Sequence, residues 1–169
     1  MPTLKPEIIY FEDNGIIPNN KYPLLLYRHV FTADGITSAA WLEQKFARNN
    51  WTNSWRWGIY PFHHYHSNTH EVLGVYSGKA LLLLGGPQGQ EINVQFGDII
   101  VIPAGVGHKN LSSSPDFSVV GAYPSGISPD LKKGEPGERP QADINIAAVP
   151  IPDFDPLMGN QGGLKNIWK

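Results

Sequence analysis

Short apolar segments separated by glycine and proline turns are the feature that most restricts how this chain can fold. Its 169 residues include 18 glycines and 15 prolines. Strands bounded by such turn formers are typically about four to eight residues long. We expect strands over residues 7–11, 24–31, 72–77, 79–84, 90–96, 99–102, 108–112 and 117–123. About eight or nine short strands predict an all-β jelly roll made of two sheets.

Helical periodicity is clear in one segment. Residues 39–49 space Trp41, Leu42 and Phe46 so that they share one apolar face. Because a helix buries such a face against a neighbour, we predict that it covers a sheet or a barrel end as a lid. Residues 141–149 fit a short helix or a strand, which leaves one or two short helices in all.

Chain length and the absence of internal repeats predict one domain over residues 1–169. We place its barrel core at about residues 51–123, and we expect an extended N-terminal arm, a strand and the helix within 1–50. A loop and tail rich in proline follow over 124–169. Both arms carry apolar side chains beyond those that the core is expected to absorb, which predicts a homodimer.

Composition excludes several classes of protein. The formal net charge is −2 and there is no stripe of lysine and arginine, which argues against a nucleic-acid partner. Cysteine is absent, so neither a disulfide nor a zinc–thiolate site can form. No apolar run approaches the roughly 18 residues of a membrane span, and the first residues lack the apolar part of a signal peptide. We therefore expect a cytoplasmic protein, with no membrane partner, that binds a small molecule.

Four of the six histidines lie within eight residues, from His63 to His70. His64 and His66 are two residues apart, and in a strand such residues point to the same face. Two imidazoles placed in this way can bind one metal ion, at about 2.0–2.1 Å from each nitrogen. Glu71 follows after a polar connection long enough to turn the chain, so its carboxylate can face the same ion from the next strand.

A second segment, residues 97–108, reads as a turn, an apolar strand, another turn and then His108. Pro103 fixes its own φ and Gly105 can adopt a positive φ, so both favour the second turn. The predicted site therefore holds three imidazoles and one carboxylate.

The two segments resemble the two sequence motifs of the cupin superfamily. The first motif, G-x5-H-x-H-x4-E-x6-G, matches Gly58, His64, His66, Glu71 and Gly78. The second motif, G-x5-P-x-G-x2-H-x3-N, matches Gly97, Pro103, Gly105 and His108, with Ser112 in place of the final asparagine. That asparagine is not a ligand in the family pattern. More loosely, residues 63–74 and the tail resemble the YjlB-like cupin group.

The resemblance implies a cupin double-stranded β-helix, which is a jelly-roll barrel, with one mononuclear metal site. It implies that the metal ligands are His64, His66, Glu71 and His108. Three neutral nitrogens and one anionic oxygen suit a divalent transition metal, namely Fe, Mn, Ni, Zn or Cu, and the ligand types do not select among these metals.

The two other histidines of the cluster, His63 and His70, each lie one residue from a predicted ligand. Strand alternation turns them away from the metal, where they would pack in the core or support the ligands through hydrogen bonds. His70 is also an alternative to Glu71 as the fourth ligand, because the sequence does not determine the length of the turn before it.

Three residues are candidates for a catalytic role: Arg56, Tyr60 and His70. Arg56 has the strand parity of His64, so its guanidinium can anchor a substrate carboxylate. The alternative for Arg56 is a salt bridge with a glutamate or an aspartate.

Aromatic residues crowd the segment 51–62. The alternation of Trp55 and Trp57 predicts that both lie on the face opposite the metal-binding histidines. A β-bulge, for which Gly58 is a suitable residue, would change this phase.

A metal with vacant coordination positions inside a barrel predicts an enzyme, and we expect an oxygenase, isomerase or lyase that acts on a small polar metabolite. Two alternatives stay open. One is a non-enzymatic module that binds a sugar or a carboxylate through the metal, and the other is a structural cupin that the metal only stabilises. Because cupins host many chemistries, the fold alone does not choose among them.

Overall fold

The apolar runs between turn formers become strands, and the aromatic segment after the first helix adds one more. The computed structural model describes residues 4–32 and 36–169, with the backbone alone described at 36 and 37. The strands are β1 (Glu7–Phe11), β2 (Asn20–Tyr27), β3 (Trp51–Trp57), β4 (Glu71–Ser77), β5 (Lys79–Leu84), β6 (Gln90–Gln95), β7 (Ile99–Ile102), β8 (His108–Ser113) and β9 (Ser118–Pro124). The helices are α1 (Ile36–Arg48), α2 (Gln141–Ala148) and α3 (Leu164–Ile167). The predicted all-β class is therefore confirmed.

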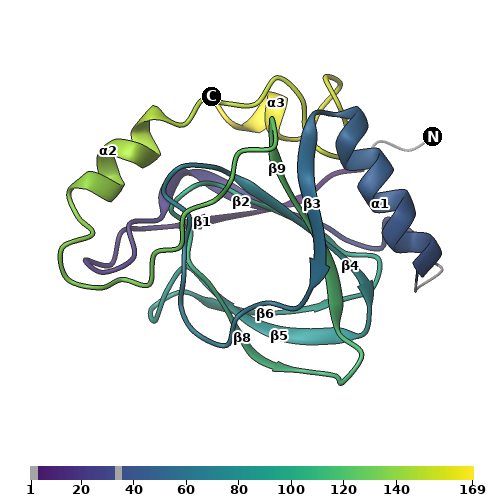
Figure 1. Cartoon of the computed structure of the whole chain (residues 1–169), viewed down its shortest axis with the longest axis horizontal. Coiled ribbons are helices and arrows are strands. Elements are labelled where there is room, and N and C mark those ends of the chain that lie inside the picture. The colour runs from purple at the N-terminus through teal and green to yellow at the C-terminus, as the bar shows by residue number, and fades with distance from the viewer. Residues whose placement is uncertain (1–3, 33–35) are drawn as a thin grey trace.

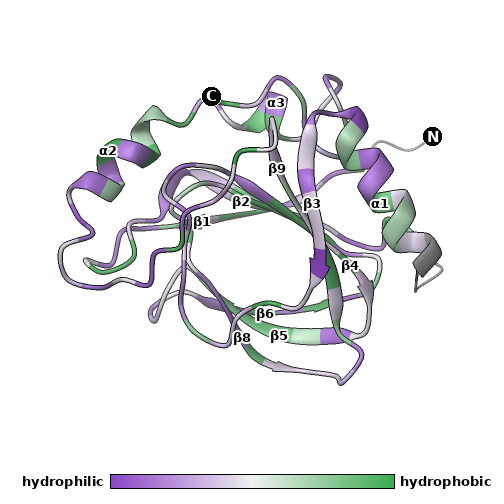
Figure 2. Cartoon of the chain, viewed as in Figure 1, coloured by the Kyte–Doolittle hydropathy of each residue, from purple (hydrophilic) through white to green (hydrophobic). Residues whose placement is uncertain are grey.

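The strands form two antiparallel sheets that face each other (Figure 1). The larger sheet has the order β1-β2-β7-β4-β9-β3, and the smaller one has the order β6-β5-β8. Neighbours in the large sheet come from distant parts of the chain, because the connections cross from one sheet to the other. This is the expected two-sheet jelly roll. Figure 2 shows hydrophobic residues along β2 and β5, which lie in different sheets.

Strand alternation divides the residues of β4 between two cores. Leu73 and Val75 belong to the buried cluster between the sheets, whereas Val72 belongs to a second cluster on the outer face of the large sheet. Because successive side chains of a strand point to opposite faces, Glu71 enters the barrel together with Leu73. The residue before it, His70, faces outward.

Helix α1 covers the outer face of the large sheet, as predicted for a lid. Leu42 and Phe46 are fully buried there, while Trp41 stays exposed and contacts Phe31. The buried face of the helix is thus narrower than the apolar face that the sequence pattern indicated. The helix approaches β4 closely at Gly74, where an added Cβ would lie 2.8 Å from a methyl group of Leu42.

The C-terminal tail completes the outer layer beside α1 (Figure 1). The indole of Trp168 is buried and donates a hydrogen bond of 2.9 Å to the carbonyl of Pro23. Asp155 is also buried, and its carboxylate accepts hydrogen bonds from the hydroxyl of Tyr27 (2.7 Å) and the amide of Leu164 (3.0 Å). These contacts bind the tail to β2.

The two arms also contain ordered secondary structure. In the N-terminal part, β1 pairs with β2 and lies at the edge of the large sheet. In the C-terminal part, the segment that fitted a helix or a strand is the helix α2. None of the helices in the described part of the chain has the length and apolar character needed to span a lipid bilayer.

Candidate metal centre

The predicted ligands come from three places in the fold. Glu71 begins β4 and His108 begins β8. His64 and His66 lie on the connection between β3 and β4, where His64 forms an isolated bridge with His108. The backbone amide of His108 donates to the carbonyl of His64 at 2.9 Å, and the reverse bond measures 3.2 Å. This bridge brings the two sequence motifs together.

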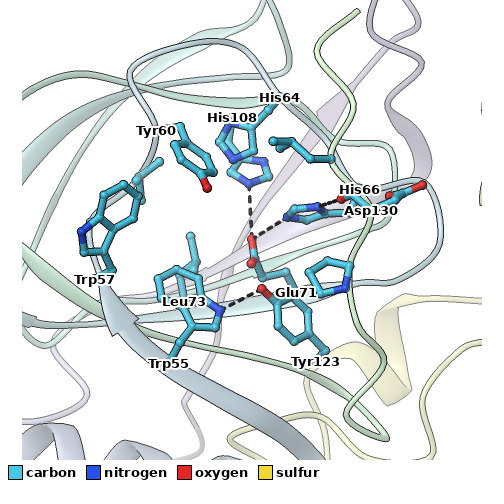
Figure 3. A pocket seen from close by; sticks show the side chains of 14 residues that line it. Trp55, Trp57, Tyr60, His64, His66, Glu71, Leu73, His108, Tyr123 and Asp130 are labelled. Carbon is cyan, nitrogen blue, oxygen red and sulfur yellow. Dashed lines mark hydrogen bonds and ion pairs between the residues drawn. The ribbon is translucent and has the colours of Figure 1, made fainter. Parts of the chain in front are cut away.

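Three imidazole rings converge inside the barrel (Figure 3). One ring nitrogen from each of His64, His66 and His108 lies within 4.8 Å of the others. The carboxylate of Glu71 lies beside them, with one oxygen 3.5 Å from Nε2 of His66 and 3.3 Å from Nε2 of His108. All four side chains are buried. The structure therefore brings together the four residues that the motifs predicted as ligands.

The other nitrogen of each ring is bound to a backbone carbonyl. The carbonyls belong to Phe62 for His64 (3.0 Å), to Val106 for His108 (3.1 Å) and to Asp130 for His66. A carbonyl can only accept a hydrogen bond, so each Nδ1 carries the proton, and Nε2 of the neutral ring keeps its lone pair. Backbone partners of this kind hold metal-binding histidines in the correct tautomer and orientation.

One of the three converging ring nitrogens is buried without a hydrogen bond. Nε2 of His108 is buried and has no hydrogen-bond partner among the described residues, although Glu71 lies only 3.3 Å away. Leaving a buried polar atom unpaired costs free energy. A metal ion among the four side chains would satisfy this atom, so the residues fit a divalent transition metal bound by nitrogen and carboxylate.

Burial and mutual charge set the protonation of the cluster. Burial, reinforced by the neighbouring His108, lowers the pKa of His64 to about 3, so this ring stays neutral at physiological pH. Burial would raise the pKa of Glu71, but His66 and His108 outweigh it and hold that pKa well below its usual range. Burial alone would lower the pKa of His66, but the charge of Glu71 raises it. A proton on His66 therefore competes with a metal ion at that nitrogen.

A cavity of about 310 Å³ opens onto the cluster. Its walls are formed mainly by large side chains, which Figure 3 shows around Glu71. They are Trp55, Trp57, Ile59, Tyr60, Leu73, Tyr123, Pro129 and Leu131. A small molecule in this cavity would contact the metal ligands directly.

Trp55 and Trp57 both line the cavity, so the prediction that they face away from the histidines is wrong. The reason is that β3 ends at Trp57 and residues 58–63 form no strand, so the alternation of β3 does not continue to His64. The ring of Trp55 lies against β9 where Gly121 has no side chain, since an added Cβ would be 2.3 Å from the indole. There its Nε1 donates a hydrogen bond of 2.8 Å to the hydroxyl of Tyr123.

His70 lies on the outer face of β4, away from the cluster. Its Nδ1 accepts a hydrogen bond from the amide of Ala104 (2.9 Å), and its Nε2 donates to the carbonyl of Pro150 (3.1 Å). The ring contacts Trp168, with 4.8 Å between centroids, and burial lowers its pKa to about 4. Because both nitrogens are occupied, this geometry favours Glu71 over His70 as the fourth ligand.

The remaining candidate residues differ in whether their side chains reach the cavity. Arg56 forms a salt bridge with Glu43 (2.7 Å) and does not line the cavity, so the alternative to a substrate anchor is the one observed. Tyr60 does line the cavity, and its ring meets that of His64 edge-on with centroids 5.2 Å apart. His63 is outside the cluster, and burial lowers its pKa.

Asp130 is a site residue that sequence reasoning did not identify. Besides its carbonyl bond with His66, its carboxylate accepts hydrogen bonds from the amide (2.7 Å) and the hydroxyl of Ser67. Asn68 accepts a hydrogen bond from the amide of Asp130 (3.0 Å) and donates one to the carbonyl of Ser128 (2.9 Å). Asp130 lies more than sixty residues from His66, Ser67 and Asn68 in the chain. A polar residue in a loop gives no local sequence signal of such a contact.

Comparisons with known proteins agree with this geometry. The family model described as "Cupin" matches residues 57–125. The uncharacterized protein YjlB of Bacillus subtilis (strain 168) is 45% identical over 160 residues, which is 94% of each chain.

Solved structures show a weaker likeness. An acireductone dioxygenase from Bacillus anthracis, with a cadmium ion in its active centre, aligns with a TM-score of 0.40 at 16% identity and covers 54% of this chain and 63% of its own. A dTDP-6-deoxy-D-glucose-3,5-epimerase from Legionella pneumophila aligns with a TM-score of 0.39 at 14% identity over 73% of each chain. The two sequence motifs, the two-sheet barrel and the extended match to YjlB lead to one conclusion: this chain belongs to the cupin family.

Proposed function

We propose that this protein is a metal-dependent cupin enzyme. It binds one divalent transition metal through His64, His66, Glu71 and His108, and it acts on a small molecule in the adjoining cavity. The observation that carries this proposal is the unpartnered Nε2 of His108, which points toward two further lone pairs and a carboxylate oxygen. Three nitrogens and one oxygen leave coordination positions free in a metal that prefers six ligands.

The reaction classes that suit this site are those of an oxygenase, an isomerase or a lyase. When bound, the metal would supply Lewis acidity, and with Fe, Mn, Ni or Cu also redox chemistry. The chain itself contributes a fixed ligand geometry, a wall of aromatic side chains that excludes water, and the hydroxyl of Tyr60 at the cavity.

One observation favours a non-enzymatic binding module as the second candidate. Of the described residues that line the cavity, only Tyr60 and Tyr123 carry a hydroxyl group. The hydroxyl of Tyr123 already accepts the indole proton of Trp55, and burial together with Glu71 raises its pKa, so it stays protonated. Few groups are thus free to move protons, as suits a protein that holds a ligand rather than converting it.

We extend the proposal to a homodimer formed through the N-terminal edge of the large sheet. β1 has a partner strand on one side only, and its Ile8 and Tyr10 are exposed. An unpaired edge with apolar side chains favours association with another strand. Sedimentation velocity should show a dimer, and a sharp monomer peak would contradict this part of the proposal.

The first test is the metal content of untagged protein, measured by mass spectrometry. We expect about one metal ion per chain in the wild type and almost none in His64→Ala. His63→Ala is the matched control, because it removes a neighbouring histidine outside the cluster and should keep its metal. Absence of metal from the wild type after reconstitution with each of the five metals would overturn the proposal.

The identity of the metal directs the second test. A redox-active metal calls for oxygen-consumption assays with small acids and diols, and zinc calls for isomerase and lyase assays. A ligand that raises the melting temperature without turnover would support the binding module. A large loss of melting temperature on chelation, with no response to any ligand, would indicate a structural metal instead.

A further inference from the structure

The walls of the cavity are largely apolar, and its buried unpaired polar atom, Nε2 of His108, lies among the predicted ligands. Apart from the hydroxyl of Tyr60 and the indole N–H of Trp57, the polar side-chain groups within the walls are already bound to other protein groups. Nε1 of Trp55 donates to Tyr123, and the carboxylate of Asp130 accepts hydrogen bonds from Ser67. A ligand with many hydroxyl groups would lose its hydrogen bonds to water here without replacement, at a cost in free energy. The walls therefore suit an apolar body.

None of the lysines and arginines that the structure describes lines the cavity. Arg56 is paired with Glu43, and the ammonium of Lys133 lies over the ring of Phe62, 4.8 Å from its centroid. The positive charge of the site would come from a divalent ion, and the carboxylate of Glu71 offsets half of it. The carboxylate of Asp130, which also lines the cavity, is held by hydrogen bonds from Ser67 instead. One negative charge on a ligand would complete the balance. A second negative charge would be buried without a partner, which is strongly unfavourable.

Aromatic faces are exposed at the mouth of the cavity. Trp57 is 59% exposed and Tyr60 is 36% exposed, and their rings meet edge-on with centroids 5.3 Å apart (Figure 3). Phe62 stacks on Tyr60 at 4.8 Å and extends this surface. Large apolar side chains gathered on a surface mark a binding site, and aromatic faces favour a flat partner that can stack on them.

The volume agrees with a ligand that contains a single ring. A cavity of roughly 150 Å³ can hold one benzene molecule. The cavity beside the histidines measures about 310 Å³, which leaves room for oxygen atoms between such a ring and the metal.

We propose that the metal centre binds small molecules with one negative charge, a pair of oxygen donors for the metal, and a flat apolar body that packs against Trp57 and Tyr60. Sugars, dicarboxylates and phosphorylated compounds are excluded as ligands. This inference rests on the proposed metal site and replaces the small polar metabolite expected from the sequence.

Matched chelators can test the inference without an activity assay. Manganese(II)-loaded protein, whose metal prefers six ligands, would be titrated in a calorimeter with benzohydroxamate, with acetohydroxamate, which has the same chelating group but no ring, and with the dianion oxalate. We expect benzohydroxamate to bind at least about tenfold more tightly than either of the others, a difference of about 1.4 kcal/mol. Manganese content would be measured after each titration, to confirm that the metal stays in the protein.

Substitutions test whether the aromatic wall causes the preference for benzohydroxamate. Trp57→Ala should reduce the advantage of benzohydroxamate over acetohydroxamate to less than about threefold, whereas Trp57→Phe should keep most of it. Trp41→Ala is the matched control, because Trp41 is exposed on α1 and does not line the cavity. Its preference should equal that of the wild type.

The outcomes separate the two proposals. Equal affinity for the two hydroxamates, or tighter binding of oxalate, would disprove the ligand class while bound manganese still supported the metal site. An unchanged preference in Trp57→Ala would likewise overturn the stacking surface. Failure of the wild-type protein to bind zinc or any of the other four metals would overturn both the metal site and the inference that rests on it.

Discussion

Two buried histidines, one inside the barrel and one on the outer face of the large sheet, are in opposite situations. Inside the barrel, His108 is 2% exposed and its Nε2 has no hydrogen-bond partner among the described residues. On the outer face, His70 is 1% exposed, but both of its nitrogens are bound to the backbone, at Ala104 and Pro150. The two rings are about equally buried, and they differ in whether one ring nitrogen has a lone pair without a hydrogen bond.

This difference separates a binding site from a structural contact better than burial does. A buried imidazole with both nitrogens satisfied stabilises the segments that it joins. A buried imidazole with a free acceptor nitrogen costs stability unless something binds to it. The inner face of β4 is therefore prepared for a ligand, and the outer face attaches the C-terminal tail to the barrel.

The largest expected effect is on the inner face. His108→Ala should weaken metal binding by more than about 100-fold, because removal of a ligand exceeds the roughly 10- to 100-fold loss typical of groups that only support one. Competition with a chromogenic chelator measures the affinity, and circular dichroism checks that the variant is folded. Unchanged affinity in a folded variant would remove His108 from the ligand set.

His70→Ala should show the reverse pattern. The amide of Ala104 and the carbonyl of Pro150 lose their partner and a cavity forms beside Trp168, so the free energy of unfolding should fall by about 2–4 kcal/mol. Urea denaturation of the metal-free protein measures this loss. Metal affinity should change by less than about threefold. A variant with intact stability and no metal would show that the two faces have been assigned wrongly.

As the pH falls, metal should leave the inner face before the contacts of His70 on the outer face are lost. Metal-binding histidines must be neutral, and Glu71 raises the pKa of His66 above its ordinary value of about 6.5, so metal is lost as the pH falls below about 6. Burial lowers the pKa of His70 to about 4, so its contacts with the tail persist at pH 5. Metal content after dialysis at about pH 7.5, 6 and 5 tests this order. Full occupancy at about pH 5 would contradict it.

The smallest expected effect concerns Arg56, which lies outside both the candidate metal centre and the contacts of His70 with the tail. Arg56→Ala removes an exposed ion pair with Glu43, so the free energy of unfolding should stay close to that of the wild type. The affinity of manganese(II)-loaded protein for benzohydroxamate should stay within about twofold of the wild type. A tenfold or greater loss of that affinity would restore Arg56 as a ligand anchor.

Local order in the sequence was sufficient to predict which four residues converge at the candidate metal centre, and most of the strands. Within β4, alternation from Leu73 and Val75 back to Glu71 assigns the carboxylate to the barrel interior and His70 to the other face. The same reasoning failed at Trp57, because the chain leaves its strand there. Alternation is a property of one strand, and it carries no information across an irregular connection.

Contacts between distant segments were beyond the reach of such patterns. Asp130 is more than sixty residues from His66, and Asp155 is 128 residues from its partner Tyr27. Both aspartates stand in tail segments rich in proline and glycine, where a surface position is the usual expectation. Only the path of the folded chain shows that each one accepts hydrogen bonds from buried groups.

The sequence by itself determined eight of the nine strands, the four residues of the candidate metal centre and the exclusion of thiolate ligands, because spacing and residue chemistry are local properties. The tertiary structure decided which aromatic residues form the cavity, that none of the described lysines and arginines lines it, and that His70 holds the tail instead of a metal. These features depend on how the two sheets and the returning tail pack against one another, and that packing arises from many weak contacts between residues far apart in the chain.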